Sequence, residues 1–140
     1  MQIKRAIEKP HIHVTAGIIR RDGRVLITRR PEGRHLGGLW EFPGGKQEEN
    51  ETLEQCLVRE IREELGVDVR PGKRLMEVDH EYEEKRVTLH FYACAPLSKR
   101  EPCGLEGQET RWVRPKTLSR FSFPPPDARM IRRLQNEEDA

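Results

Sequence analysis

Apolar side chains recur along the chain in short runs typical of β-strands, separated by turns that contain glycine or proline. Residues 11–19 are β-branched and apolar, Asp22-Gly23 is a hairpin signal, and residues 25–28 fit the returning strand. Further strands are predicted over residues 40–42, 75–82, 87–95 and 109–113, with a loop over 31–39 and a turn at Pro43-Gly44-Gly45. We expect the strands over 75–82 and 87–95 to pair with each other.

Residues 52–65 have helical periodicity instead. An apolar residue stands at every fourth position, namely Leu53, Leu57, Ile61 and Leu65. Asn50 or Thr52 is suited to cap the start of this helix, and Gly66 stands where a left-handed C-terminal residue is needed. The segment is the best helix in the chain.

A second helix is predicted after the three consecutive prolines that end at Pro126. Asp127 can cap it, and residues 128–135 place Met130, Ile131 and Leu134 toward the core. Strands that surround two helices indicate an α+β or α/β fold with a mixed sheet. The length of 140 residues fits one domain, residues 1–140.

Composition limits the classes of function. Charged residues make up 36% of the chain, but the net charge is only +2, which lacks the basic excess of a general nucleic-acid binder. The three cysteines form no C-x-x-C pair and are expected to be free thiols. The sequence has no secretory h-region and no apolar stretch long enough for a membrane span. We expect a cytoplasmic protein, favoured as a monomer, that binds a small acidic ligand through arginines and has no stable nucleic-acid partner.

The first predicted helix carries acidic residues beside its apolar stripe. On a helical wheel, Glu64 lies about 40° from Glu60 on one side and Glu63 about 60° from it on the other. Glu60 and Glu64 therefore border the apolar stripe, where a carboxylate must be paired, hydrogen-bonded or bound to metal. Arg59 and Arg62 point elsewhere on the wheel and are predicted to be poor neutralisers of this cluster.

A hard divalent cation would neutralise these carboxylates. Oxygen ligands suit Mg²⁺ or Mn²⁺, and glutamates spaced i, i+3 and i+4 converge on one patch of a helix. Gly44 and Gly45 permit backbone to approach a ligand closely, so a carbonyl there could complete the coordination. A solvated, salt-bridged helix is the alternative interpretation of the same glutamates.

A larger set of residues, in which every specified position is filled, resembles the Nudix box. It comprises Gly45, Glu51, Arg59-Glu60-Ile61, Glu63-Glu64, Gly66 and Val67. The stretches VTAGIIRRDGRVLITRR, LWEFPGGK, VTLHFY, EGQETRWV and FSFPPPD are similar to the MutT subgroup of that family. The resemblance implies an α/β/α sandwich around a mixed sheet, with a catalytic loop-helix-loop. It also implies a hydrolase that cuts a nucleoside triphosphate into a monophosphate and pyrophosphate.

The resemblance assigns roles to individual residues. Mg²⁺, or Mn²⁺ as a substitute, would be held by Glu60, Glu63, Glu64, Glu106 and the carbonyl of Gly44. Glu51 and Arg59 would brace the motif, with Arg59 orienting a carboxylate. Substrate would meet Arg30, His35, Glu41, Phe42, Pro43, Gly44 and Asp127. Phe42 is equally open to a role in the core, and His35 to simple exposure.

The chemistry requires one carboxylate to take a proton from the attacking water. Glu60 is the preferred general base, and Glu63 and Glu106 remain alternatives because a metal ligand and a base look alike as residue types. Strand alternation places Arg29 and Arg30 on opposite faces, so at most one can reach the phosphates, and the resemblance favours Arg30.

The sequence leaves the nucleobase of the substrate open between oxidised guanine and cytosine. Asp127 stands where the MutT-type enzymes for oxidised guanine have an asparagine, and Lys85-Arg86 departs from the subgroup's pattern in another ligand-facing loop. An ionised aspartate only accepts hydrogen bonds, whereas asparagine also donates. The interpretations kept open are an 8-oxo-dGTP diphosphatase active in nucleotide-pool sanitising and DNA repair, a CTP or dCTP pyrophosphohydrolase, an enzyme for another diphosphate, and a catalytically silent binding module.

Overall fold

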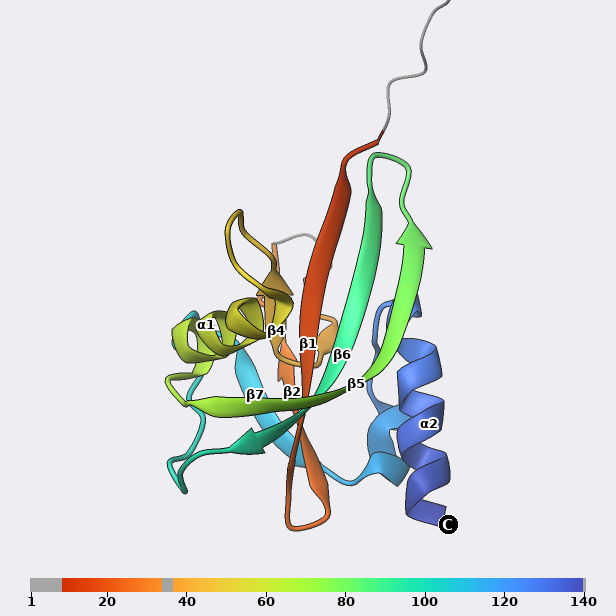
Figure 1. The fold of residues 1–140 in the computed structure, drawn as a ribbon. Helices are drawn as coiled ribbons and strands as arrows, with labels where there is room; N and C mark the ends of the chain where they lie inside the picture. The colour runs from red at the N-terminus through yellow and green to blue at the C-terminus, as the bar shows by residue number, and fades with distance from the viewer. Residues whose placement is uncertain (1–8, 34–36, 140) are drawn as a thin grey trace, which may run out of the picture.

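The computed structural model describes residues 9–33 and 37–139, which contain both predicted helices and every predicted strand (Figure 1). The strands are β1 (His11–Arg21), β2 (Arg24–Arg29), β3 (Trp40–Glu41), β4 (Gly44–Lys46), β5 (Val69–Glu81), β6 (Arg86–Pro96) and β7 (Glu109–Val113). The helices are α1 (Leu53–Leu65) and α2 (Ala128–Asp139), and 3-10 turns η1 (Pro115–Arg120) and η2 (Pro125–Asp127) precede α2.

The strands form one mixed sheet. β1 and β6 run parallel at its centre, and the other pairs, including β5 with β6, are antiparallel. The helices α1 and α2 lie on opposite sides of this sheet (Figure 1). Alternation along β1 sends Ile18 into the core beneath α2 and Ile19 into the core beneath α1. The structure is therefore a three-layer α/β/α sandwich, as predicted.

Two predictions of local structure need correction. Gly44 and Gly45 belong to strand β4, which pairs with Val14–Ala16 of β1, and do not form a turn. Gly44 has φ 156, and a Cβ there would collide with the carbonyl oxygen of Thr15, so glycine is required by the close pairing of two backbones. Strand β5 is also longer than predicted, because register shifts between Pro71 and Met76 hide its alternation.

None of the described helices combines the length and the apolar character needed to cross a membrane.

Candidate active site

Helix α1 is fixed at both ends by its own sequence. The Thr52 side chain accepts a hydrogen bond from the backbone N–H of Gln55, and the Gln55 side chain accepts one from the backbone of Thr52. Gly66 ends the helix in the left-handed conformation at φ 67, and its N–H donates to the Arg62 carbonyl. The cap is thus Thr52, one of the two predicted candidates, and the helix holds its glutamates at a defined edge.

Glu60 and Glu64 are half-buried at this edge, as the helical wheel predicts, whereas the side chain of Glu63 is 54% exposed. Burial raises the pKa of Glu60. Burial raises the pKa of Glu64 to about 9, with the charges of Glu60, Glu41 and Glu106 acting in the same direction. The ionised forms of these two carboxyl groups are therefore disfavoured at this edge, by burial and by neighbouring carboxylates.

Gly45 lies directly beneath the Glu60 carboxylate. A Cβ at Gly45 would overlap the Glu60 carboxylate group, so the absence of a side chain gives Glu60 its position. The Gly45 carbonyl accepts from Thr15 Oγ1 at 3.3 Å and from Cys56 Sγ at 3.4 Å. The two glycines of β4 therefore have distinct steric reasons to be glycine.

Arg59 neutralises part of the cluster, contrary to the prediction from the wheel. Its guanidinium donates to both oxygens of Glu51 at 2.7 and 3.0 Å, to Glu60 at 2.8 Å and to Glu63 at 3.2 Å. A wheel shows only the direction in which a side chain leaves the helix, and the long arginine side chain folds back over its neighbours. The Arg59 hydrogen bonds lower the pKa of Glu51 to about 2, so Glu51 stays ionised and anchors Arg59.

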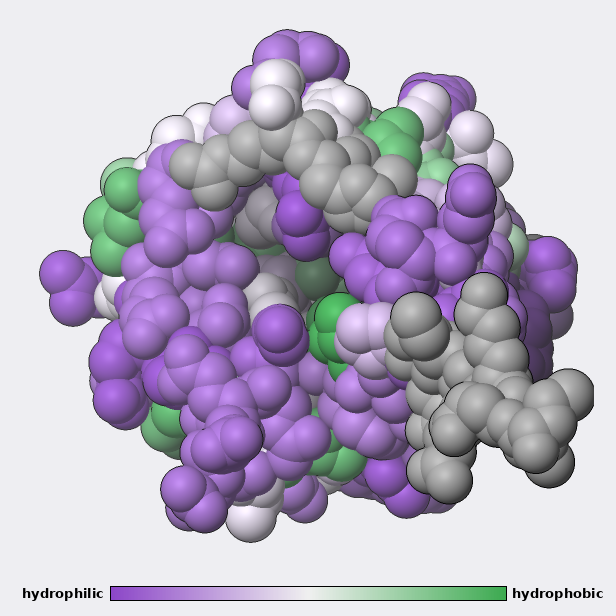
Figure 2. Space-filling view, turned by 90° about the horizontal axis from the view of Figure 1, so that it is seen from above, coloured by the Kyte–Doolittle hydropathy of each residue, from purple (hydrophilic) through white to green (hydrophobic). Residues whose placement is uncertain are grey.

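A small cavity of about 100 Å³, here called the acidic pocket, opens beside Glu64. It is lined by Arg30, Pro31, Glu41, Glu64, Glu106 and Gln108. The structure thus brings together Glu64 and Glu106, which lie far apart in sequence. The face seen in Figure 2 is hollowed, with hydrophilic side chains around the rim and hydrophobic ones inside.

The donors of the acidic pocket fit a hard divalent cation in type and charge. They are carboxylate oxygens, and the pKa of Glu64 is raised first by burial and then by neighbouring carboxylates, whose repulsion a cation would offset. Among the described residues, no group of three His, Cys, Asp or Glu side chains is arranged to hold one ion together. Mg²⁺ is commonly held by one or two carboxylates, with water and substrate phosphates as its other ligands, so this arrangement still suits it.

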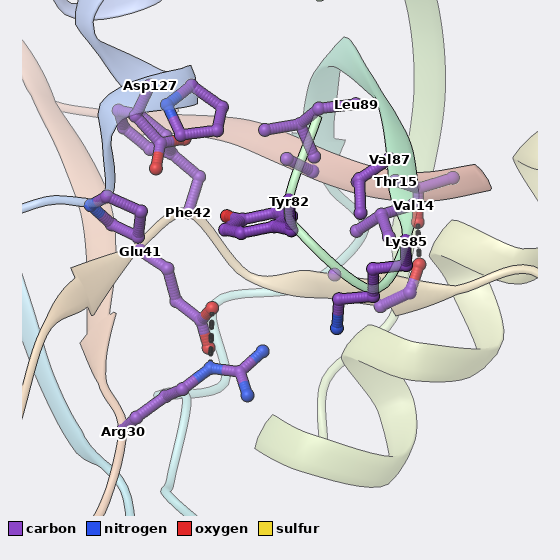
Figure 3. Close-up of a pocket in the computed structure, with 15 residues that line it drawn as sticks. Val14, Thr15, Arg30, Glu41, Phe42, Tyr82, Lys85, Val87, Leu89 and Asp127 are labelled. Carbon is purple, nitrogen blue, oxygen red and sulfur yellow. Dashed lines mark hydrogen bonds and ion pairs between the residues drawn. The ribbon is translucent and has the colours of Figure 1, made fainter. Parts of the chain in front are cut away.

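A second cavity of about 130 Å³, here called the apolar pocket and drawn in Figure 3, shares Arg30 and Glu41 with the first. Its apolar lining comprises Val14, Ala16, Phe42, Val87, Leu89, Pro124 and Pro126. Its polar lining comprises Thr15, Arg30, Glu41, Tyr82, Lys85 and Asp127, with the two glycines of β4. Apolar walls with a few polar groups are typical of a site for a small-molecule ligand.

Asp127 is the buried acid of the apolar pocket, with only 4% of its surface exposed. Burial raises its pKa to about 7, and the charge of Glu41 acts in the same direction. It is the last residue of η2, directly before α2, so the turn after the prolines directs it into the pocket. Near neutral pH the side chain exists in both the ionised and the protonated form.

Comparison with known proteins agrees with this geometry. The family model described as NUDIX domain matches residues 14–133. The chain belongs to the Nudix family. This Nudix domain is 40% identical over 132 residues to a Haemophilus influenzae protein named 8-oxo-dGTP diphosphatase, covering 94% of the chain and 96% of that relative. It is 35% identical over 120 residues to an Escherichia coli protein named CTP pyrophosphohydrolase, covering 86% and 88%.

The structure is also similar to a crystal structure titled MutT protein from Methanosarcina mazei Go1. The TM-score is 0.83 at 28% identity, with 96% of this chain and 100% of the other covered. The family, the fold and the hydrolase class predicted from the sequence are confirmed by these findings. Nudix hydrolases generally need a divalent metal ion, which agrees with the acidic edge of α1.

The Nudix domain places most of the predicted site residues together, but not all of them. Arg30, Glu41, Gly44 and Asp127 line the apolar pocket, and Arg30 pairs with Glu41 at 3.0 Å. Phe42 also lines it while packing on Phe91 and Phe123, so both interpretations of Phe42 fit its position. Pro43 is buried and does not line this pocket; its carbonyl accepts the Gly17 N–H. His35 lies outside the described residues.

Sequence reasoning missed most of the residues that line the apolar pocket, including two side chains from one turn. Tyr82 directly follows β5 and Lys85 directly precedes β6, so both reach the pocket from the connecting turn (Figure 3). The Lys85 ammonium lies 5.6 Å from the centre of the Tyr82 ring. The turn is distant in sequence from Phe42 and Asp127 of the same pocket, and only the departure at Lys85-Arg86 from the subgroup's pattern signalled it.

Proposed function

We propose that this Nudix domain is a Mg²⁺-dependent nucleoside triphosphate diphosphatase that releases a nucleoside monophosphate and pyrophosphate. The observation that carries the proposal is the adjacency of two sites. The acidic edge of α1, with Glu60 and Glu64, lies next to an apolar pocket that Arg30 and Glu41 also line. One nucleotide could therefore occupy both sites, with its aromatic base in the apolar pocket and its phosphate chain in the acidic pocket.

Glu60, Glu63, Glu64 and Glu106, with the Gly44 carbonyl, are the groups we propose to hold Mg²⁺ or, in its place, Mn²⁺. A bound divalent ion supplies charge to phosphate oxygens and acidifies water. Glu64 and Glu106 line the acidic pocket, and Glu60 acts on Glu64 as a neighbouring charge. Glu63 is more exposed and pairs with Arg59, so we expect it to contribute less than Glu60 and Glu64.

The chain's own residues would position the reactants. Glu60 is the preferred general base because burial raises its pKa, which makes the carboxylate a stronger proton acceptor. Arg59 holds Glu60 at 2.8 Å and is in turn anchored by Glu51, so we assign it a positioning role. Arg30 donates to Glu41 and faces both pockets, where its guanidinium would bind phosphate oxygens.

We propose 8-oxo-dGTP as the preferred substrate. The relative named 8-oxo-dGTP diphosphatase is 40% identical to this chain, and the similarity covers nearly its whole length. The buried Asp127 supports this choice. With a pKa of about 7, its protonated form both donates and accepts, as the asparagine of the MutT type does. The cytidine alternative rests on the same residue, since an ionised aspartate accepts from an exocyclic amino group, and on the relative named CTP pyrophosphohydrolase.

A substrate panel tests the proposal directly. We expect kcat/KM for 8-oxo-dGTP to exceed that for dGTP, dCTP and CTP by more than about tenfold, or about 1.4 kcal/mol. A higher value for CTP or dCTP would favour the cytidine alternative. A preference below tenfold throughout would show that the apolar pocket does not select a base, and would direct attention to other diphosphates.

Pyrophosphate release with and without Mg²⁺ separates the enzyme from a silent binding module. The box glutamates are all present, which favours the enzyme. We further propose that the protein acts as a single domain, as a monomer, in the cytoplasm, on free nucleotides without a stable nucleic-acid partner. If no turnover occurs at any Mg²⁺ or Mn²⁺ concentration, the proposed enzyme activity is contradicted and a catalytically silent binding module is supported.

A further inference from the structure

Two histidines face each other across the parallel pair β1–β6. His13 Nδ1 lies 3.0 Å from His90 Nε2, while the ring centroids are 5.3 Å apart. The two rings therefore lie end to end, with the nitrogens pointing at each other along one line. Only 3% of the surface of His90 is exposed, so water has little access to its side of the contact.

The neutral pair shares a single proton between these nitrogens. A neutral imidazole carries one N–H and one lone pair, so one ring donates and the other accepts. The other nitrogen of His90, Nδ1, lies 3.4 Å from Glu77 and 3.4 Å from Arg74, and these two neighbours favour opposite tautomers. In either tautomer of His90 a single proton between the two rings completes the hydrogen bond.

A second series of hydrogen bonds, next to the His13–His90 contact, extends to β5 at the edge of the sheet. Thr88 Oγ1 donates to Asp79 at 2.5 Å and lies 2.6 Å from His11 Nε2. The Thr88 hydrogen bond lowers the pKa of Asp79, so Asp79 is an ionised acceptor and Thr88 must accept from His11 Nε2–H. The ring centroids of His11 and His13 are 4.4 Å apart, so the two sets of hydrogen bonds are in contact.

We infer that His13 and His90 form a proton-sharing clamp between β1 and β6, which a second proton opens. When both rings are protonated, two N–H donors face each other and two positive charges lie in contact. The buried ring of His90 cannot replace the lost hydrogen bond with water. The β1–β6 contact therefore changes from attractive to repulsive.

Other charged groups lie around the pair on the neighbouring elements. They are Arg74, Glu77 and Asp79 of β5, Arg86 of β6, His11 of β1, Lys46 of β4, the loop residues Glu48, Glu49 and Glu51, and Glu54 of α1 beside Tyr92. Glu77 and Asp79 raise the pKa of His90, but burial lowers it more, with His13 and Arg74 in support. The net effect lowers the pKa of His90, so His90 stays neutral at a pH at which a free histidine is already partly protonated.

The clamp lies next to the strand that carries the candidate metal-binding backbone. The His13 carbonyl accepts the Gln47 N–H at 2.9 Å, and the next three residues of β1 pair with β4. Opening the clamp would therefore loosen the β1 segment against which Gly44 and Gly45 are held. The inference itself does not depend on the proposed function.

Histidine-ring NMR of the wild-type protein provides the first test. We expect one of the facing nitrogens to be protonated at about pH 8 and His90 to take up its proton below pH 6.5, with signals of both rings reporting the same event. A His13 ring signal that does not change when His90 is protonated, or uptake by His90 at or above pH 6.5, would overturn the inference.

Urea unfolding at about pH 8 and about pH 5.5 provides the second test. The pKa of His90 is lowered in the folded state, so the unfolded state binds its proton more tightly and stability falls as pH drops through 6.5. We expect the folding equilibrium constant to fall about tenfold for each unit of that lowering. His13→Gln and His90→Gln should shrink this loss, and the control His80→Gln should retain it. An equal loss in the wild type and both clamp variants would contradict the clamp.

Discussion

Arg30 Nε and Glu41 Oε2 form an ion pair of 3.0 Å that lines both the apolar pocket and the acidic pocket (Figure 3). Burial raises the pKa of Glu41, while Arg30 opposes this by charge and by hydrogen bonding. The charge of Glu41 in turn raises the pKa of Asp127 and of Glu64. One carboxylate therefore links the proposed base-binding site to the proposed phosphate-binding site, and each should respond to a ligand in the other.

Gly45→Ala should displace the Glu60 carboxylate. A Cβ at this position overlaps the Glu60 carboxylate, and the Gly45 backbone is not in the left-handed region, so the damage falls on the side chain. We expect kcat to fall by about 10²-fold or more if Glu60 is the base, with near-native circular dichroism. A variant with wild-type kcat would show that the position of Glu60 does not matter for the reaction.

Glu60→Gln removes the proposed proton acceptor while keeping the shape of the side chain. General bases typically contribute about 10²–10⁴-fold, so a loss in that range at saturating Mg²⁺ is expected. Glu54→Gln, on the exposed first turn of the same helix, is the matched control and should retain activity. Metal affinity measured in parallel separates a lost base from a lost ligand. Near-wild-type kcat at saturating Mg²⁺ would exclude Glu60 and leave Glu63 and Glu106.

The sequence was most informative where local rules dominate. Helix α1 could be predicted with its caps and its acidic edge, because periodicity, Thr52 and Gly66 all act within a few turns of each other. The parallel pairing of β1 with β6 could not be read from the pattern, because it joins residues separated by some seventy positions. Tyr82 and Lys85 were missed as pocket residues for the same reason, since the pocket exists only once β5 and β6 reach the prolines before α2.

Arg59 illustrates a different limit of sequence reasoning. A wheel gives the direction in which a Cβ leaves the helix but not the reach of the Arg59 guanidinium, which bonds to three glutamates. The glycines of β4 were recognised as important, but their reason is steric contact with Thr15 and Glu60 across the fold. Such contacts depend on tertiary packing that no local pattern encodes.

Arg59→Lys should preserve the charge but lose the arrangement of the cluster. The lysine ammonium is a point charge and cannot bridge Glu51 and Glu60 as the planar guanidinium does. We expect metal affinity or kcat/KM to fall about 10–100-fold, as for other groups that orient a ligand. Arg62→Lys is the matched control, because Arg62 lies at the exposed surface and pairs there with Asp68. Equal effects of the two variants would remove the positioning role of Arg59.

Asp127→Asn should abolish a pH dependence centred near neutrality. Burial raises the pKa of Asp127 to about 7, so below that pH the wild-type side chain both donates and accepts, and above it only accepts. We expect kcat/KM for 8-oxo-dGTP to fall in the wild type as pH rises through about 7, and Asp127→Asn to lose this inflection.

Folding stability should also depend on pH through Asp127, and it should fall as the pH rises. The folded-state pKa of Asp127 lies above the ordinary value of 3.8, so the folded protein binds this proton more tightly than the unfolded chain does. Stability from this group is present below pH 3.8 and is lost as pH rises from there to about 7. Asp127→Asn should therefore be relatively more stable than the wild type at about pH 8 than at about pH 5, as measured by urea unfolding. A constant stability difference between the two proteins across this range would show that Asp127 is not a buried acid with a raised pKa.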